Sequence, residues 1–306
     1  MTPSSSTASL DRFTAAAELV ASGLIGSYST SFGLATRLLG RRHRQHIRNI
    51  YALVRVADEI VDGVAAQAGL DPAAQRACLD DFAAQTHRAM DAGLSNNMVV
   101  HAFAVTARLN GIDESLTVPF FDSMRADLDP ADLDPAGTGA DGLHVFGTEE
   151  RDRYVHGSAE VVGLMCLRVF LYGRHPAPVE RAVLERGAAR LGAAFQNVNF
   201  LRDLAEDTDR LGRSYLSGDE RLDDAGRDAW VAVIRGQLDD ARRAVPLLPA
   251  DCRAAVRSAL ALFAELTERL ARTPAEQLYR TRVRVPDPVK IALAGREVVR
   301  TRMEAR

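Results

Sequence analysis

The sequence predicts an all-α fold, and two observations carry that prediction. Ala, Leu, Arg, Glu and Asp dominate the chain, which is typical of helical proteins. No segment shows the sustained alternation of apolar and polar residues expected of a half-buried strand. At 306 residues the chain has the length of one large domain or two small ones, and either would hold a sizeable core.

Helical periodicity recurs in segments separated by residues that interrupt helices. The predicted helices are 45–63, 74–91, 150–172, 179–208, 227–245 and 251–271. The predicted breaks are Gly40, the turn at 70–73, and the stretches 173–178 and 246–249. Residues 127–142 are acidic and rich in Pro and Gly, so we expect a mobile surface loop there, and loops of that length are often functional.

Composition and charge narrow the class of function. The formal net charge of −3 gives no indication of a nucleic-acid partner. Cys78, Cys166 and Cys252 lie far apart without a CxxC or Cys/His cluster, which argues against zinc and disulfides and fits a reducing cytoplasm. The first residues lack the basic and apolar regions of a signal peptide, and no apolar run reaches membrane-spanning length. We therefore expect a cytoplasmic protein.

Segment 196–207, QNVNFLRDLAED, collects carboxylates and carboxamides along one helical stripe. Positions four apart lie about 40° apart around a helix, so Asp203 and Asp207 project the same way, and Gln196 and Asn199 extend the stripe. The flanks are apolar. Because a helix that is apolar nearly all round is buried, the stripe must face an internal cavity or a polar partner.

A second stripe occurs in YALVRVADEIVDG, where Tyr51, Arg55, Asp58 and Asp62 follow one another at spacings of 4, 3 and 4. Like charges four apart destabilise a helix, so two such pairs require cations, and Mg²⁺ commonly bridges carboxylates to phosphate oxygens. The alternative is ordinary surface charge, with Arg55 and Arg202 forming structural salt bridges to Asp58 and Asp203. Spacing alone leaves both interpretations open.

These two segments resemble the aspartate-rich signatures of the squalene/phytoene synthase family. The similarity continues through STSFGLATRLL, FFDSMRADL, YVHGSAEVVGLMCLRVF and RVRVPDPVK, in the expected order over roughly residues 20 to 295. Within the family, the sequence is most similar to bacterial, particularly actinobacterial, phytoene synthases. The resemblance implies a single-domain, all-α isoprenoid-synthase fold around a central cavity, at residues 13–306, after a flexible tail at 1–12.

The resemblance also implies the site. Asp58 and Asp62 match the first metal-binding pair and Asp203 and Asp207 the second, with Glu59 and Glu206 as minor or outer-sphere ligands of Mg²⁺, for which Mn²⁺ could substitute. Arg55, Arg202 and Tyr154 are the implied catalytic residues, and Tyr154 matches a tyrosine associated with proton handling near the departing diphosphate. The implied substrate-binding residues are Ser31, Phe32, Thr36, Tyr51, Ala159, Val162, Gly163, Met165, Gln196, Asn199, Arg213, Tyr215 and Arg282.

Two subsets of these residues have distinct implied roles. Gln196, Asn199, Tyr215 and Arg282, with the two arginines, match positions that contact diphosphate or the metal–water shell. The four residues from 159 to 165 match the lining of a prenyl channel, for which ordinary helix packing is the alternative. The sequence departs from the family at 28–31, where no Lys or His stands to hold diphosphate, and at Phe263, where a tyrosine is frequent.

The implied activity is Mg²⁺-dependent, head-to-head condensation of two geranylgeranyl diphosphates to phytoene through a cyclopropylcarbinyl (prephytoene) diphosphate. This is the first committed step of carotenoid biosynthesis, and it needs no NADPH. Peripheral contact with the inner face of the membrane would assist product release. Thr36, four residues after Phe32, stands where C30 enzymes carry a bulky aromatic residue, which favours the longer substrate.

Three alternatives stay open. A C30 enzyme would make squalene, dehydrosqualene or presqualene diphosphate from farnesyl diphosphate. A class I terpene cyclase would need aromatic walls, which 6% aromatic residues and one Trp supply poorly. A catalytically silent helical partner should have lost one of the four aspartates, and all are present.

Overall fold

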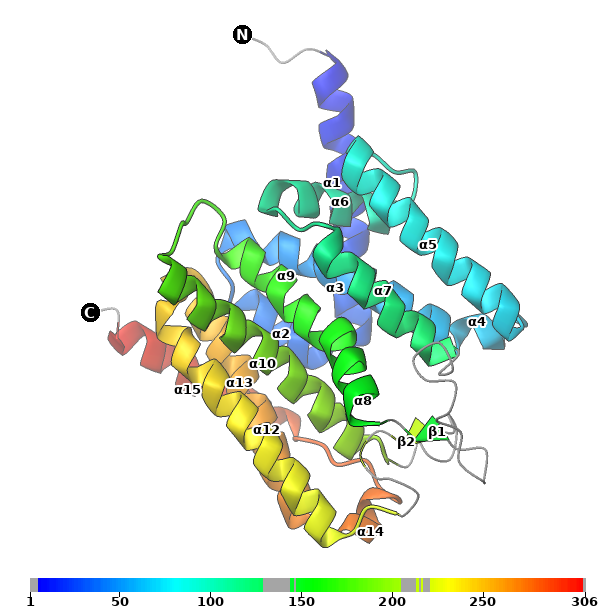
Figure 1. Cartoon of the computed structure of the whole chain (residues 1–306). Helices are drawn as coiled ribbons and strands as arrows, with labels where there is room; N and C mark the ends of the chain where they lie inside the picture. Colours follow the sequence, from blue (N-terminus) through cyan, green and yellow to red (C-terminus); the bar gives the residue numbers. More distant parts are fainter. Residues whose placement is uncertain are drawn as a thin grey trace.

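Helices form nearly all of the described chain in this computed structural model, which describes residues 5–128, 144–145, 147–204, 213–214, 216 and 221–304 (Figure 1). The longer helices are α1 (Ser5–Tyr28), α2 (Thr30–Arg37), α3 (Arg41–Asp62), α5 (Pro72–Ala92), α6 (Met98–Asn110), α7 (Glu114–Leu128), α8 (Thr148–Val155), α9 (Val161–Phe170), α10 (Pro178–Arg202), α12 (Asp224–Ala244), α13 (Ala250–Arg272) and α15 (Asp287–Glu304). Short helices α4 (Val64–Gln67) and α14 (Ala275–Leu278) fill two connections. The predicted all-α fold is confirmed.

The only strand pairing within the described ranges is a parallel one, two residues long, between β1 (His144–Val145) and β2 (Arg213–Ser214). The sequence gives no sign of it, because two residues are too few to show an alternating pattern.

The predicted breaks coincide with observed helix ends, for local reasons that the sequence carries. Gly63 ends α3 with a φ of 142°, a conformation that side chains rarely adopt. Asp71 caps α5 by accepting a hydrogen bond from the Ala74 amide at 2.8 Å, and Pro72 occupies the first helical position.

Two predicted helices differ from the structure. The segment 150–172 is interrupted by a π-helical segment, His156–Glu160, between α8 and α9. The helix predicted at 179–208 corresponds to α10, which ends earlier, at Arg202, with Asp203 as its C-cap residue. Residues 5–12, expected to belong to a flexible tail, form the beginning of α1, and their flexibility stays a prediction. Residues 129–142 of the expected loop lie outside the described residues, whereas 127 and 128 belong to α7.

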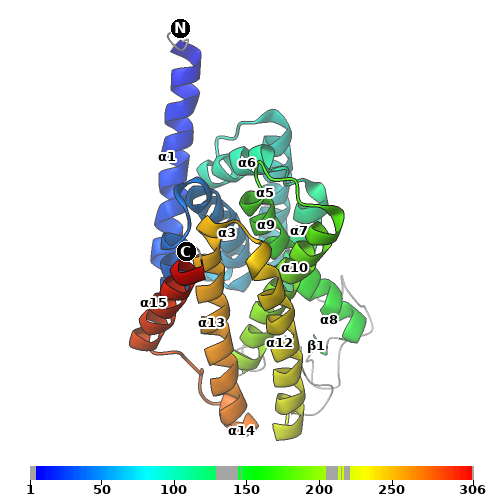
Figure 2. The same ribbon diagram turned by 90° about the vertical axis from the view of Figure 1, so that its left-hand side faces the viewer.

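The helices enclose two hydrophobic clusters, and α7, α10 and α13 contribute residues to both. The first cluster also joins α1, α3, α5, α6 and α9, and the second also joins α8 and α12. In two views a quarter turn apart, α10, α12 and α13 run alongside one another, and α15 lies on the outside of α13 (Figures 1 and 2). No helix in the described part combines the length and apolar character needed to cross a membrane.

Candidate active site

The first acidic group lies in the last two turns of α3. Ile50, Leu53 and Ala57 bury the opposite face of this helix in the first cluster, and this burial fixes the direction of the stripe that carries Asp58 and Asp62. The stripe is therefore oriented by ordinary core packing, as its apolar flanks predict.

Arg55 is the cation within this group. Its guanidinium donates to Asp58 Oδ2 at 2.6 Å, also contacts Glu59, and lies 4.4 Å from the ring centroid of Tyr28. Among the described contacts of this stretch, one arginine binds two of the three acids, Asp58 and Glu59, and Asp62 is the third. The acids therefore outnumber the arginine, and negative charge is in excess.

The excess shows in the ionisation of Asp58. Burial is the largest cause and the charge of Asp62 the next, and together with Asp127 they outweigh the opposing effect of Arg55 and raise the pKa of Asp58 to about 8. A third of the Asp58 side chain is nevertheless accessible (34%). Because the charge of Asp62 affects this pKa more than the opposing charge of Arg55, negative charge outweighs positive charge around this carboxyl.

A divalent cation fits this deficit. Within the described ranges no three His, Cys, Asp or Glu side chains converge tightly enough to hold an ion, and Glu206 and Asp207 lie outside those ranges. Mg²⁺ usually keeps several waters and takes one or two carboxylates plus substrate phosphates, rather than a cage of protein ligands. Open, oxygen-rich groups such as Asp58 with Asp62 match that donor set.

Asp127 connects this group to Tyr154. The phenolic hydroxyl of Tyr154, on α8, donates to both carboxylate oxygens of Asp127, near the end of α7, at 2.9 and 3.0 Å, and both residues are buried. One turn earlier, Ser123 Oγ donates to the Tyr154 carbonyl oxygen at 3.1 Å. Tyr154 is therefore held by α7 at its ring end and at its backbone.

A close approach of backbones makes this possible. The π-helical segment begins two residues after Tyr154, and a Cβ on Gly157 would lie 2.1 Å from both the Pro119 carbonyl oxygen and Ser123 Oγ. Only glycine fits there, so Gly157 sets the separation of α7 from the segment that carries Tyr154. Such π-helical insertions are frequent at functional sites.

Asp127 did not stand out from the sequence as a site residue. The available signal was the position of Asp127, the second of two acids in FFDSMRADL, directly between Ala126 and Leu128, since a buried carboxylate requires a partner. Which partner it would find depends on the position of α8, which spacing does not reveal.

The second acidic group forms where α10 ends. Arg202 binds Asp203 through its Nε at 2.9 Å and its Nη2 at 2.5 Å, and Arg282, from the connection before α15, binds the same carboxylate through its Nε at 2.9 Å. The structural salt bridges weighed from the sequence are thus present at both Asp58 and Asp203. Asn199 and Gln196 lie one and two turns before Asp203, respectively, and both are half-buried, as the stripe predicts.

Four aromatic side chains form a group on α2, α3, α10 and α13, and two of these helices, α3 and α10, also carry the acidic groups. Phe32 on α2 lies within 6.0 to 6.3 Å, between ring centroids, of Tyr51 on α3, Phe195 on α10 and Phe263 on α13. Phe195 and Phe263 stack at 3.7 Å. Thr36, one turn after Phe32 on the same helix, is buried, and its hydroxyl donates to the Gly33 carbonyl oxygen at 3.0 Å.

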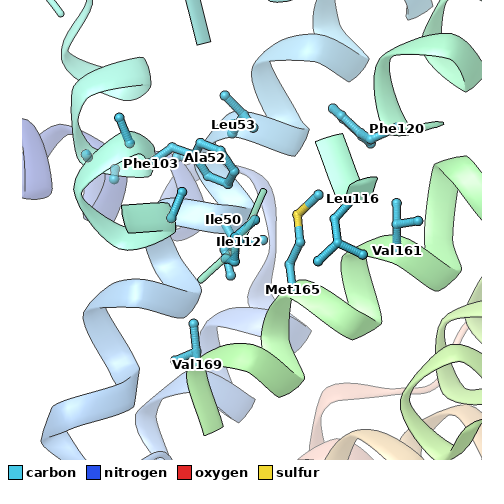
Figure 3. Packing of buried hydrophobic residues seen from close by; sticks show 14 of the residues in the cluster. Ile50, Ala52, Leu53, Phe103, Ile112, Leu116, Phe120, Val161, Met165 and Val169 are labelled. Atoms are coloured by element: carbon cyan, nitrogen blue, oxygen red, sulfur yellow. The ribbon is translucent and has the colours of Figure 1, made fainter. Parts of the chain in front are cut away.

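The four expected channel residues take different positions. A Cβ on Gly163 would lie 2.4 Å from the Ala188 carbonyl oxygen, so α9 and α10 are in close backbone contact there. One on Gly192 would lie 2.3 Å from the Ala159 carbonyl oxygen, so α10 also approaches the π-helical segment closely. Met165 is fully buried in the first cluster, near Leu116 (Figure 3). Val162 is half-buried against the same cluster. Packing therefore accounts for Gly163 and Met165, and channel lining by all four stays a prediction.

Ring contacts bridge the two acidic groups. The hydroxyl of Tyr154 donates to Asp127, and its ring centroid lies 6.0 Å from that of Phe200. Phe200 lies on α10, one turn before Asp203. Of the remaining expected residues, Arg213 lies in β2 and Ser31 in α2, while Tyr215 lies outside the described residues.

Solved structures share this architecture. A dehydrosqualene synthase with bound ligand superposes with a TM-score of 0.70, covering 95% of this chain and 98% of that one at 23% identity. That likeness shows the fold: this chain has the helical architecture of that dehydrosqualene synthase.

The sequence then identifies the family. The squalene/phytoene synthase model matches residues 25–288, so the chain belongs to the squalene/phytoene synthase family. Among curated relatives, phytoene synthase 3 of Zea mays is 33% identical over 70% of this chain, and 15-cis-phytoene synthase of Paracoccus sp. is 28% identical over 87%. The match spans 48% of the maize protein, about half its length, and 86% of the Paracoccus protein.

Proposed function

We propose that the protein is a phytoene synthase, which condenses two geranylgeranyl diphosphates head to head, through prephytoene diphosphate, to phytoene. The observation that carries this proposal is the similarity to the Paracoccus 15-cis-phytoene synthase along almost the full length of both chains. The two acidic groups, each bound by arginine, support it, because ionising an allylic diphosphate requires a cationic site.

The aspartates would hold the metal. Asp58 and Asp62 on one side, and Asp203 and Asp207 on the other, are the proposed ligands of Mg²⁺, or of Mn²⁺ in its place, with Glu59 and Glu206 assisting. When bound, the metal would supply the positive charge that stabilises the diphosphate leaving group.

The arginines have a second role in this proposal. Arg55, Arg202 and Arg282 each bind a proposed metal ligand in the absence of substrate. With diphosphate present, their guanidinium groups would turn to its oxygens, which they match as bidentate donors. Arg55 would also supply cationic charge beside Tyr28, where the sequence lacks the family's Lys or His. Gln196, Asn199 and Tyr215 would complete the polar lining.

Tyr154 is the proposed proton-handling group. Its phenolic oxygen is buried, and Asp127 fixes its orientation through two hydrogen-bond distances of 2.9 and 3.0 Å. A positioned hydroxyl of this kind can give or take a proton near the departing diphosphate. The final cation would lose a proton, so we expect no requirement for NADPH.

A C30 enzyme that uses farnesyl diphosphate is the second candidate, supported by the structural likeness to a dehydrosqualene synthase. Thr36 favours the C20 substrate, because a small residue in this position leaves room for one more isoprene unit. We place the enzyme in the cytoplasm, with peripheral contact at the inner face of the membrane.

The test is incubation of the purified protein with Mg²⁺ and either geranylgeranyl or farnesyl diphosphate, without NADPH, followed by identification of extracted products. Phytoene from the C20 substrate supports the proposal. A C30 hydrocarbon formed preferentially from farnesyl diphosphate would establish the second candidate, and no product from either substrate would refute both.

A further inference from the structure

Three arginines gather where α1, α2 and α3 contact one another (Figure 1). Arg37 lies in the last turn of α2, and Arg44 and Arg48 lie one turn apart near the beginning of α3. Arg44 and Arg48 are half-buried, whereas Arg37 is exposed. Burial is the largest cause that lowers the pKa of Arg48, and the charges of Arg44 and Arg37 lower it further. The three guanidinium groups are therefore close enough to repel one another.

No acid neutralises this cluster within the described part of the chain, where none of the three arginines forms an ion pair. Glu18 on α1 lies beside the cluster, one turn before Ser22. Its carboxyl accepts a hydrogen bond from Asn49, and burial raises its pKa without an opposing effect of any arginine. Half-buried like charges without a counter-charge destabilise a fold, so the cluster calls for an anion that the described residues do not supply.

The arginines also keep unused hydrogen-bond donors. Arg44 donates through Nη2 to the carbonyl oxygens of Arg37 and Leu39, at 2.8 and 2.9 Å, which fixes its guanidinium at the end of α2. Arg48 donates through Nη1 to Ser22 Oγ at the long distance of 3.4 Å. Among the described residues, Nη1 of Arg44, Nη2 of Arg48 and the whole guanidinium of Arg37 have no acceptor and remain for a ligand.

The cluster lies apart from the candidate active site. Arg44 and Arg48 share the face of α3 that carries Arg55, but Arg48 precedes Arg55 by two turns, about 10 Å along the axis. Arg55 binds Asp58 and Glu59, whereas the cluster has no carboxylate partner in the described chain. When no metal is bound, an anion is therefore more favourable at the cluster than at the acid-rich end of the stripe.

We propose that Arg37, Arg44 and Arg48 bind a small anion of the phosphate type at a site separate from the candidate active site. Guanidinium groups match phosphate oxygens as bidentate donors, and a doubly charged ion would neutralise most of the positive charge. By joining Arg37 to the two arginines of α3, the ion would hold the end of α2, the helix that carries Phe32 and Thr36. Half-burial of Arg44 and Arg48 between helices favours a small soluble ion over the headgroups of a flat bilayer.

Titration with orthophosphate tests this site on the full chain, in EDTA without Mg²⁺, so that no metal bridges phosphate to the aspartates. At constant ionic strength, we expect phosphate to raise the unfolding midpoint of the wild type and to bind in calorimetry. Arg48→Gln should bind phosphate more weakly by about tenfold or more. Without phosphate, this variant should unfold at the same or a higher temperature than the wild type, because an unpaired, half-buried charge has been removed.

Two further variants separate ligand binding from stability. Arg37 is exposed, so Arg37→Gln should fold as wild type and also bind phosphate more weakly. Arg12→Gln is the matched control, because it removes the same charge from an exposed position on α1, and it should bind phosphate as wild type.

Three outcomes would overturn the site: no effect of phosphate on the wild type, undiminished binding by Arg48→Gln and Arg37→Gln, or equal loss in the Arg12→Gln control. Loss of binding in Arg55→Gln but not in Arg48→Gln would place the ion in the candidate active site instead. A lower unfolding midpoint of Arg48→Gln with phosphate binding retained would give Arg48 a structural role only.

Discussion

Two arginines bind Asp203: Arg202, its neighbour in the chain, and Arg282, from a distant connection. Such an arrangement can belong either to a metal-binding site or to a salt bridge that only stabilises the fold. The same arrangement occurs on the protein surface, where Asp240 binds Arg186 and Arg243 at 2.9 and 2.6 Å. Contacts alone therefore do not distinguish a metal ligand from a salt bridge. The distinction requires matched substitutions.

Asp203→Asn should lower turnover by about 10²-fold or more, because it removes a proposed metal ligand while nearly preserving shape. Steady-state turnover with saturating Mg²⁺ measures this. Asp240→Asn is the matched control, since it also takes one carboxylate from two arginines, and it should keep wild-type activity. Full activity in folded Asp203→Asn would refute the metal assignment.

The pair formed by Tyr154 and Asp127 gives a second prediction. Tyr154→Phe removes the buried donor and should lower turnover by about 10²-fold, the usual size of a general acid–base effect. It should also cost about 1 to 3 kcal/mol of unfolding free energy, because the Asp127 carboxylate loses a hydrogen bond.

Asp127→Asn separates the two effects. The amide oxygen can still accept from the phenol, so we expect the stability to be largely retained while the turnover falls. Tyr172→Phe, at an exposed tyrosine, should change neither quantity. If turnover and stability fell in proportion in every variant, Tyr154 would have a packing role only.

At the scale of elements, close helix contacts decide where the site residues stand. Helices α9 and α10 touch at Gly163, and the π-helical segment meets α10 at Gly192 and α7 at Gly157. These contacts bring α8 and its tyrosine between the two acidic groups. The sequence contains the glycines but does not indicate which helix each one faces.

Gly192→Ala should destabilise the protein by about 1 to 3 kcal/mol, because the new Cβ meets backbone atoms of Ala159 that cannot move aside. Denaturant unfolding measures this loss. Gly236→Ala in α12 is the matched control: nothing lies within 4 Å of its added Cβ, so it should stabilise by about 0.5 to 1 kcal/mol. Equal effects of the two substitutions would contradict the close contact.

Helix α2 carries the prediction on chain length. Thr36 is buried on the same helix as Phe32, so Thr36→Phe should place a ring beside the aromatic group. We expect C40 product from geranylgeranyl diphosphate to be suppressed and C30 product from farnesyl diphosphate to be spared. Product ratios from the two substrates measure this, and an unchanged C40 rate would refute the assignment of Thr36.

At the scale of the whole molecule, polar contacts of two histidines attach α1 and α3 to α6. His101 Nε2 lies 2.9 Å from Thr14 Oγ1, and His46 Nδ1 lies 2.9 Å from Thr106 Oγ1. Burial is the largest cause that lowers the pKa of both histidines below the usual value. Both are therefore neutral in the folded protein at neutral pH.

Lowered pKa values of this kind make folding sensitive to acid. Between the folded pKa and the unfolded value of about 6.5, the unfolded chain binds more protons at these two histidines, so their contribution to the unfolding free energy decreases as the pH falls below about 6.5. The decrease is at most about 1.4 kcal/mol per pH unit for each histidine. Denaturant unfolding between pH 7.5 and 5 measures it. The raised pKa values of Asp58, His156 and Glu18 contribute with the opposite sign, those of Asp58 and His156 within the same pH range and that of Glu18 nearer pH 4.5.

His101→Asn should reduce this dependence on pH, whereas the exposed His175→Asn should leave it unchanged. A pH profile that is the same in His101→Asn and the wild type would contradict the assignment of a neutral, buried His101.

By itself the sequence determined the helical class, the breaks at glycines and prolines, and the two acidic stripes, because these depend on local periodicity and on residues that terminate helices. Family membership follows from the same residues. The tertiary structure alone decided that α10 ends at Arg202, that Arg282 reaches Asp203, and that Asp127 binds Tyr154. The physical reason is distance along the chain: partners separated by tens of residues meet only once the helices have packed, and packing is governed by contacts such as those of Gly157 and Gly192, which leave no periodic signal in the sequence.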